Sequence, residues 1–338
     1  MFKGRKINKG RMGNNSANTV RNNSVKRAVR NNIIFWIIVF FFPCACCLTV
    51  HLIDKDIVIG QGGYSVDRHK LNKNIMLEIN GFYKSIDVEE YVVGVMAGVI
   101  PADYCKEALK AQAVLIRTNV LKEMEEKNTR DAADISYQYL TREDRELLWG
   151  RINMDRNERI MEYAVSSTCG KVIRKEDNLI MAMYHEVSIG KTADASEVLD
   201  EDISYLKSVD SSQDVEAKNY MNIYTYSWEK LGELFNNLTA DKIEISIDES
   251  TENGFVKKVS AGGSIYTGQE LADLLELPSI NYYVEEQENG IRFVCLGKGS
   301  CLGLSQYGAN YMASNGKTME EIISYYYKDV SVEKALGN

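Results

Sequence analysis

Polar side chains that could transfer protons or bind a polar ligand gather in three short stretches of the chain. Asp103 follows the proline at position 101, residues 184–192 read YHEVSIGKT, and residues 305–307 read SQY after a glycine-containing turn. A carboxylic acid such as Asp103 or Glu186 can serve as a general acid or base. Hydroxyl and amide groups such as those of residues 305–307 can donate and accept hydrogen bonds. The three stretches therefore contain residue types that could support proton transfer or polar binding.

Two helices separated by a proline corner are predicted to position the first stretch. Asp87 and Glu90 have the spacing of a capping box, and apolar residues then recur at helical spacing up to Val99. The helix should end before Pro101, because proline disfavours helical geometry in the residue that precedes it. A second helix is expected from about Asp103 to position 126, and Asp103 itself could be its N-cap.

The other two stretches are expected to lie among short strands. Residues 169–188 read as two strands around the polar turn 175–178, and further strands are expected near 255–268 and 282–297. A last helix should occupy residues 318–327, where a threonine and a glutamate three residues later have capping-box spacing. Because helices and strands do not alternate regularly, the sequence predicts an α+β domain.

Composition places the chain among globular proteins that do not bind nucleic acid. Of 338 residues, 45% are hydrophobic and 26% are charged, and the net charge is −8. Nine of the 40 Lys and Arg residues lie in the first 50 positions, which contain no Asp or Glu. The rest of the chain therefore has 31 basic and 48 acidic residues. A body with this excess of negative charge repels phosphate backbones, so nucleic acid is not an expected partner.

The N-terminal part predicts a membrane anchor. Residues 1–32 are basic, and residues 33–50 are 18 residues without a charge, which is at the lower limit for a transmembrane helix. The positive-inside rule then places residues 1–32 in the cytoplasm and the body outside it. A cleaved signal peptide and a buried core helix are the alternatives for residues 33–50. The prediction is a single-pass membrane protein with a cytoplasmic tail 1–32, an anchor 33–50, a linker 51–74, an exported domain 75–330 and a C-terminal tail 331–338.

Cysteine and histidine spacing gives no metal site. No cysteine follows His185 until Cys295, so no ligand cluster can be assembled around the histidine, and neither a metal nor another cofactor is expected.

Four cysteines fall in the exported domain, and they could form disulfides in three connectivities or remain buried free thiols. They are Cys105, Cys169, Cys295 and Cys301.

Several sequence blocks resemble the stage II sporulation protein D and amidase-enhancer family. The first is EEYVVGVMAGVIPADYCKEALKAQAVLIRT at 89–118, and the others are 167–192, YLKSVDSSQD at 205–214, YTGQELADLLELPS at 266–279 and GKGSCLGLSQYGA at 297–309. The blocks occur in the family's order. The resemblance implies a single SpoIID-like domain with a glycan-binding cleft, which works on peptidoglycan during engulfment of the forespore. It also implies two partners, a cell-wall amidase and the glycan strands that this amidase has stripped of stem peptides.

The resemblance implies a lytic transglycosylase, but the expected catalytic acid is missing. The family has a glutamate two residues before the proline of the first block, and Val99 occupies that position here. Since valine cannot transfer a proton, we expect a pseudoenzyme that binds glycan strands or supports the amidase. One alternative is an active enzyme in which Asp103 or Glu186 supplies the carboxyl group. Another is a scaffold of the engulfment machinery that does not contact glycan.

The second and third stretches supply the substrate-binding residues that the resemblance implies. The chain departs from the family pattern here as well, because Ser300 replaces a histidine, Cys301 replaces a glycine, and Ile189 stands where the family has a glycine. For His185 and Gln306 the alternative is a structural role as buried, hydrogen-bonded residues. The predicted substrate-binding residues are Tyr184, His185, Ser188, Lys191, Thr192, Ser305, Gln306 and Tyr307.

Overall fold

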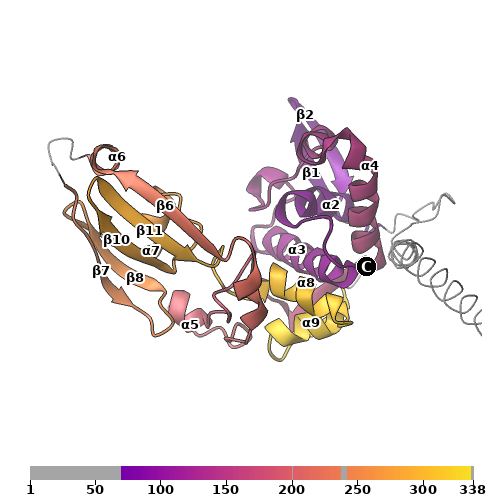
Figure 1. The fold of residues 1–338 in the computed structure, drawn as a ribbon. Coiled ribbons are helices and arrows are strands. Elements are labelled where there is room, and N and C mark those ends of the chain that lie inside the picture. The colour runs from indigo at the N-terminus through magenta and orange to yellow at the C-terminus, as the bar shows by residue number, and fades with distance from the viewer. Residues whose placement is uncertain (1–69, 200, 237–241, 336–338) are drawn as a thin grey trace, which may run out of the picture. The chain divides into compact units, whose positions relative to one another are not determined.

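The computed structural model describes residues 70–199, 201–236 and 242–335. The chain divides into two units, and all described residues belong to the second unit, Val66–Asn338. Most helices lie in the first and last thirds of this unit, and two sheets lie between them in sequence (Figure 1). The α-helices are α2 (Val88–Val99), α3 (Lys106–Glu126), α4 (Arg142–Ser167), α5 (Ala195–Val198), α6 (Trp228–Leu234), α7 (Gly268–Leu274), α8 (Gln306–Ser314) and α9 (Met319–Tyr326), and the 3-10 helices are η2 (Ala132–Asp134) and η3 (Ser212–Glu216). The strands are β1 (Asn74–Ile79), β2 (Phe82–Asp87), β3 (Lys171–Lys175), β4 (Asn178–Leu179), β5 (Tyr184–His185), β6 (Met221–Ser227), β7 (Ile245–Ser250), β8 (Val256–Ala261), β9 (Ser264–Thr267), β10 (Tyr282–Gln287), β11 (Gly290–Leu296), β12 (Leu304–Ser305) and β13 (Ser331–Lys334).

Helix α2 begins where the sequence predicts and ends before Pro101. Its N-cap is Asp87, whose side chain accepts a hydrogen bond from the backbone N–H of Glu89 at 2.9 Å. The expected capping box does not form, because the Glu90 carboxylate pairs with the Lys84 ammonium at 3.4 Å instead. The helix therefore ends at the proline corner as predicted. At its start, the Asp87 side chain is the cap that forms.

Helix α3 begins three residues later than predicted. Its N-cap is Cys105, not Asp103, and Asp103 lies exposed in the corner turn. The backbone N–H of Cys105 donates to Oδ1 of Asn310 in α8 at 2.7 Å. A group from the far end of the chain thus satisfies an N–H that a local cap would otherwise have satisfied, which is why spacing alone places the N-cap wrongly.

A buried ion pair fixes α3 against α2. The Arg117 guanidinium is fully buried and donates to both carboxylate oxygens of Glu89, from Nε at 2.8 Å and from Nη2 at 2.5 Å. Glu89 also accepts from the backbone N–H of Gly170 at 3.0 Å, and Arg117 donates to the carbonyl of Val165 at 3.2 Å. This pair is fully hydrogen-bonded on both sides, as a buried charge must be if it is to be tolerated. It therefore holds α2, α3 and the end of α4 together.

The predicted hairpin at 169–188 forms, and the C-terminal part of the chain adds a third strand to it. β3 and β4 pair antiparallel, and β13 pairs with the other edge of β3, with Ser331 opposite Arg174 and Lys334 opposite Lys171. Residues 331–334, which were expected to belong to a C-terminal tail, are therefore part of the fold. The reason is the edge of β3, whose backbone groups need a hydrogen-bonding partner.

The middle of the chain builds two three-stranded antiparallel sheets, with strand orders β10-β11-β6 and β7-β8-β9. These contain the strands expected near 255–268 and 282–297. On the inner face of the first sheet, Phe293 lies edge-on to Tyr226 and Tyr282, with ring centroids 5.8 and 5.9 Å apart.

The capping box of α9 also forms as predicted, from Thr318 with Glu321.

Two hydrophobic clusters meet at α3. Leu115 of α3 belongs to the first cluster, which contains Val259 and Phe293 of the two sheets and the buried side of α9. The next residue, Ile116, belongs to the second cluster, which contains Val92 of α2 and the buried side of α4. Helix α3 is therefore buried on two sides and forms a wall that both clusters share.

The combination of helices and separate antiparallel sheets confirms the α+β class.

The four cysteines of the described residues, Cys105, Cys169, Cys295 and Cys301, are free thiols. Among residues 70–199, 201–236 and 242–335, no helix has the length and apolar character needed to cross a bilayer. The predicted tail 1–32 and anchor 33–50 lie outside the described residues.

Candidate functional site

The fold places the three polar stretches next to one another. Strand β12 pairs in parallel with β5, which places Ser305 opposite His185. At the start of α8, the Gln306 amide donates to the backbone carbonyl of Val99 at 2.8 Å, and the Tyr307 N–H donates to the carbonyl of Glu186 at 3.1 Å. Residues about 200 positions apart in sequence therefore form one site, which we call the corner site.

A buried carboxylate forms the centre of the corner site. Asp214 lies within η3, is fully buried and accepts from the Ser188 N–H at 2.7 Å and from the Ser305 hydroxyl at 2.6 Å. Its second oxygen accepts from the Ser211 hydroxyl at 3.0 Å. Three donors from three segments thus satisfy one buried charge, which is what keeps a carboxylate tolerable in the interior. Asp214 was quoted within a family-like block but not predicted as a site residue.

His185 lies beside this carboxylate and is neutral at pH 7. Its ring is buried, and Nδ1 lies 3.0 Å from the carbonyl oxygen of Leu302. Because a carbonyl can only accept, Nδ1 carries the proton, and Nε2 is left as a buried acceptor with no partner. Burial lowers the pKa of His185 to about 4, although the Leu302 bond and the charge of Asp214 act in the opposite direction. A buried, neutral imidazole is placed to support the site rather than to touch a ligand.

Four of the other predicted substrate-binding residues also face inward. Ser188, Thr192, Ser305 and Gln306 are buried. The Thr192 hydroxyl accepts from the Val209 N–H at 2.9 Å, and the Gln306 amide donates to Val99 and to Gln112 at 3.2 Å. These side chains use their polar groups within the protein, so they form a rigid floor under the corner site.

The exposed part of the corner site is smaller and contains a residue that sequence reasoning missed. Lys191 is exposed, and Tyr307 and Tyr184 are partly exposed, although Tyr184 packs against both hydrophobic clusters. Tyr104, in the proline corner, is also partly exposed. Burial raises the pKa of Tyr104 to about 12, and nearby groups including Glu186 and Asp103 add to the shift. Tyr104 therefore lies near both candidate carboxylates, and its place in the first family-like block was the only signal for it.

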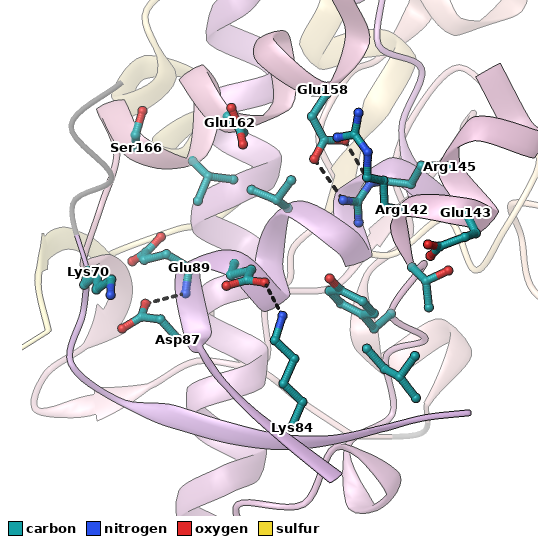
Figure 2. A pocket seen from close by; sticks show the side chains of 16 residues that line it. Lys70, Lys84, Asp87, Glu89, Arg142, Glu143, Arg145, Glu158, Glu162 and Ser166 are labelled. Atoms are coloured by element: carbon teal, nitrogen blue, oxygen red, sulfur yellow. Dashed lines mark hydrogen bonds and ion pairs between the residues drawn. The ribbon is translucent and has the colours of Figure 1, made fainter. Parts of the chain in front are cut away.

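A cavity of about 520 Å³ lies apart from the corner site, between the β1–β2 hairpin, α2 and α4 (Figure 2). Its charged side chains are largely engaged with one another. Arg145 forms two hydrogen bonds with the carboxylate of Glu158, at 2.9 and 2.8 Å, and Lys84 pairs with Glu90. None of the predicted site residues lines this cavity. The glycan-binding cleft implied by the resemblance stays a prediction for the corner site.

Comparison with known proteins gives one family match and several similar proteins. The family model described as stage II sporulation protein (SpoIID) matches residues 80–174, which run from the β1–β2 turn into β3. The chain is 29% identical over 273 residues to stage II sporulation protein D of Bacillus subtilis (strain 168), with 76% of this chain and 77% of that protein covered. It is also 29% identical over 265 residues to stage II sporulation protein D of Bacillus amyloliquefaciens, with the same shares covered. An uncharacterized protein of Brachyspira hyodysenteriae is 25% identical over 257 residues, with 73% of this chain and 67% of that protein covered.

Residues 80–174 therefore carry a SpoIID-family domain, and the chain is similar to stage II sporulation protein D over 76% of its length.

The position that was expected to hold a catalytic glutamate carries no acid in this chain. Val99 is the last residue of α2, is partly buried and packs against the second hydrophobic cluster. The two other candidate carboxylates differ in their surroundings. Glu186 accepts from the Lys298 ammonium at 2.6 Å through Oε2 and from the Asn219 amide through Oε1, whereas Asp103 is exposed beyond the corner. Neither Lys298 nor Asn219 was predicted as a site residue, since only the fold brings them to Glu186.

At position 301, where the SpoIID family pattern has a glycine, this chain has a cysteine. Cys301 has φ +59°, in the left-handed region that favours glycine. Two residues on, Gly303 has φ +67°, and a Cβ there would come within 2.0 Å of the Met183 carbonyl oxygen. The turn before β12 therefore has both Cys301 and Gly303 in the left-handed region. By contrast, Ile189 does not adopt a positive φ, so its side chain causes no backbone strain.

Among the residues that the structure describes, no group of three or more His, Cys, Asp and Glu side chains is arranged to hold a metal ion. Burial raises the pKa of the Cys301 thiol to about 12, as it does for Cys295. Both thiols therefore stay protonated, which does not favour a nucleophile or a metal ligand.

Proposed function

We propose that this SpoIID-family protein acts in sporulation by binding denuded peptidoglycan glycan strands at the corner site without cleaving them. The observation that carries the proposal is Val99 at the position of the expected catalytic glutamate. A lytic transglycosylase needs a carboxylic acid that protonates the glycosidic oxygen and then removes a proton from the sugar. The apolar side chain of Val99 can do neither.

The neighbouring carboxylates do not replace the missing acid in this geometry. Both oxygens of Glu186 already accept hydrogen bonds, from Lys298 and from Asn219. A proton donor in that position would have to break one of these interactions before it could reach a ligand. Asp103 lies in solvent beyond Pro101, and catalytic acids work best in water-excluded surroundings.

Retention of binding is supported by the arrangement around the missing acid. Asp214, His185 and Gln306 form a hydrogen-bonded floor, above which Tyr104 and Tyr307 remain partly exposed. A tyrosine ring can stack on the apolar face of a sugar while its hydroxyl bonds to water or to sugar hydroxyls.

Val99 and Ile189 are only partly buried, which supports a binding surface rather than a closed core. Val99 packs against the second cluster, whereas Leu302 belongs to the first cluster and Ile189 packs against it. In this proposal residues 33–50 anchor the protein, the corner site faces the cell wall, and a cell-wall amidase prepares the strands.

The test is to incubate the full-length protein with stem-peptide-free glycan strands and to measure both retention on the strands and 1,6-anhydro-muramyl products by mass spectrometry. We expect retention without product. Val99→Glu restores a carboxyl group, and Val99→Gln is the control of matched size that cannot transfer a proton. Product from Val99→Glu alone would show that only the acid is missing.

Two results would contradict the proposal. Anhydro products from the unaltered protein that disappear in Glu186→Gln or Asp103→Asn would identify an enzyme with a relocated acid. Failure of the unaltered protein to bind strands would leave the scaffold alternative.

A further inference from the structure

The outward face of the β6-β11-β10 sheet carries a continuous row of apolar side chains. The register places Ile223 opposite Val294 and Val294 opposite Tyr283, so these three lie on one face of the sheet. Met221 is likewise opposite Leu296, two residues along the strands and on the same face. We call these five residues, Met221, Ile223, Tyr283, Val294 and Leu296, the apolar strip.

The apolar strip faces solvent, whereas the opposite face of the same sheet is core. Met221, Ile223 and Tyr283 are 55%, 56% and 53% exposed. The alternate residues Phe293 and Tyr282 are buried in the first hydrophobic cluster. Val294 and Leu296 are partly exposed, and contiguous exposed apolar surface of this kind commonly marks a binding site. Figure 1 shows the three strands side by side, with β6 at one edge of the sheet.

The apolar strip begins at the edge of the corner site. Asn219 lies two residues before Met221, and Lys298 lies two residues after Leu296. Both side chains bond to the carboxylate of Glu186 in the corner site. A chain-like ligand that leaves the corner site over Asn219 and Lys298 would therefore meet the strip next.

The surroundings of the strip match the surface of a sugar chain. The next cross-strand row is polar, with Thr225 opposite Arg292 and Arg292 opposite Glu285, and the last two form an ion pair at 3.3 Å. Burial raises the pKa of Tyr220 at the near end of the strip, and the nearby Tyr283 adds to the shift. A pyranose ring has an apolar face and a rim of hydroxyl groups, so an apolar row beside a polar row suits it. Strands about 4.8 Å apart give the row a spacing close to the width of one ring.

We propose that the apolar strip is an outer binding surface for the same glycan strand, so that the strand runs from the corner site along β6 and β11. This inference rests on the proposed function, because it assumes that glycan occupies the corner site. It adds that strand length determines affinity: short fragments fill the corner site alone, whereas long strands also cover the strip.

The experiment compares the affinity of the full-length protein for short denuded glycan fragments and for long denuded strands. The variants are Ile223→Ser and Tyr283→Ser, singly and combined. Ile265→Ser is the matched control, because Ile265 is 64% exposed but lies on β9 in the other sheet. All three side chains are exposed, so the variants should keep the thermal stability of the parent. We expect the double variant to bind long strands roughly tenfold more weakly, with no change for short fragments or for Ile265→Ser.

Other outcomes separate this inference from the proposed function. If the unaltered protein binds both ligands and the double variant binds them equally well, the strip is not a glycan surface, although the corner site is. If the unaltered protein binds neither ligand, both proposals fail. If the double variant keeps its strand affinity but loses association with the partner amidase, the strip is a protein-binding surface and the inference is overturned.

Discussion

The residues of the corner site divide into two functional groups that their types alone do not distinguish. Ser188, Ser305 and Asp214 are polar, but their donors and acceptors bond to one another in the interior. Tyr104 and Tyr307 keep part of their surface in solvent. Sequence reasoning treated polar character as evidence for ligand contact, whereas burial shows that most of these side chains position the loops instead.

The first prediction concerns the buried imidazole of His185. Its folded-state pKa is lowered to about 4 from the ordinary 6.5, mainly by burial, so between these pH values the unfolded chain binds a proton that the folded chain does not. The free energy of unfolding should therefore fall as the pH is lowered through this window, by at most about 3 kcal/mol from this group. His185→Asn keeps a donor near the Leu302 carbonyl but does not titrate.

Chemical denaturation of the parent and of His185→Asn at several pH values tests this. The difference in unfolding free energy between the two proteins should depend on pH between about 6.5 and 4 and should level off above that range. A difference that stays constant across the window would mean that the ring is not held neutral. Acidic residues with lowered pKa, such as Asp194, contribute equally to both proteins and cancel in the difference.

At the scale of elements, local signals in the sequence were sufficient where the cause of the structure is local. Pro101 ends α2, and the capping box at Thr318 starts α9, as predicted. The start of α3 was placed wrongly, because the group that satisfies Cys105 comes from α8, about 200 residues away. The pairing of Lys298 and Asn219 with Glu186 was likewise invisible, since only tertiary folding brings these segments together. Long-range hydrogen bonds are thus what the sequence alone could not provide.

The second prediction concerns β13, the strand that was expected to be a tail. Val332 packs against the first hydrophobic cluster, the Lys334 ammonium donates to the carbonyl of Cys169, and the Ala335 N–H donates to the carbonyl of Gly170 at 2.6 Å. A chain that ends at Val330 should therefore lose about 2 kcal/mol or more of unfolding free energy, since it exposes an edge of β3 and loses apolar contact. A chain that ends at Ala335 is the control. Equal denaturation midpoints for the two chains would show that β13 adds nothing to stability.

At the scale of the whole described unit, α3 determines how the parts depend on one another. Leu115 and Ile116 are adjacent in sequence and fully buried, yet they belong to different hydrophobic clusters. The side chain of Arg117 then bonds to Glu89 of α2. A chain of this length commonly unfolds through intermediates when its parts have separate cores. Here the two cores share one helix, so neither keeps its packing when α3 is lost.

The last prediction follows from this sharing. Ile116→Ala removes buried methyl and methylene groups from the second cluster and should cost about 3 kcal/mol of unfolding free energy. Because α3 also supports the first cluster, the most protected amides of β8 and β11 should lose hydrogen-exchange protection by the same free energy as those of α2. Leu147→Ala, at a site that is 85% exposed on α4, is the control and should leave both sets unchanged. If β8 and β11 kept their protection while α2 lost it, the sheets would unfold independently of the helices. The shared helix would then transmit no stability from the helices at the corner site to the sheet that carries the apolar strip.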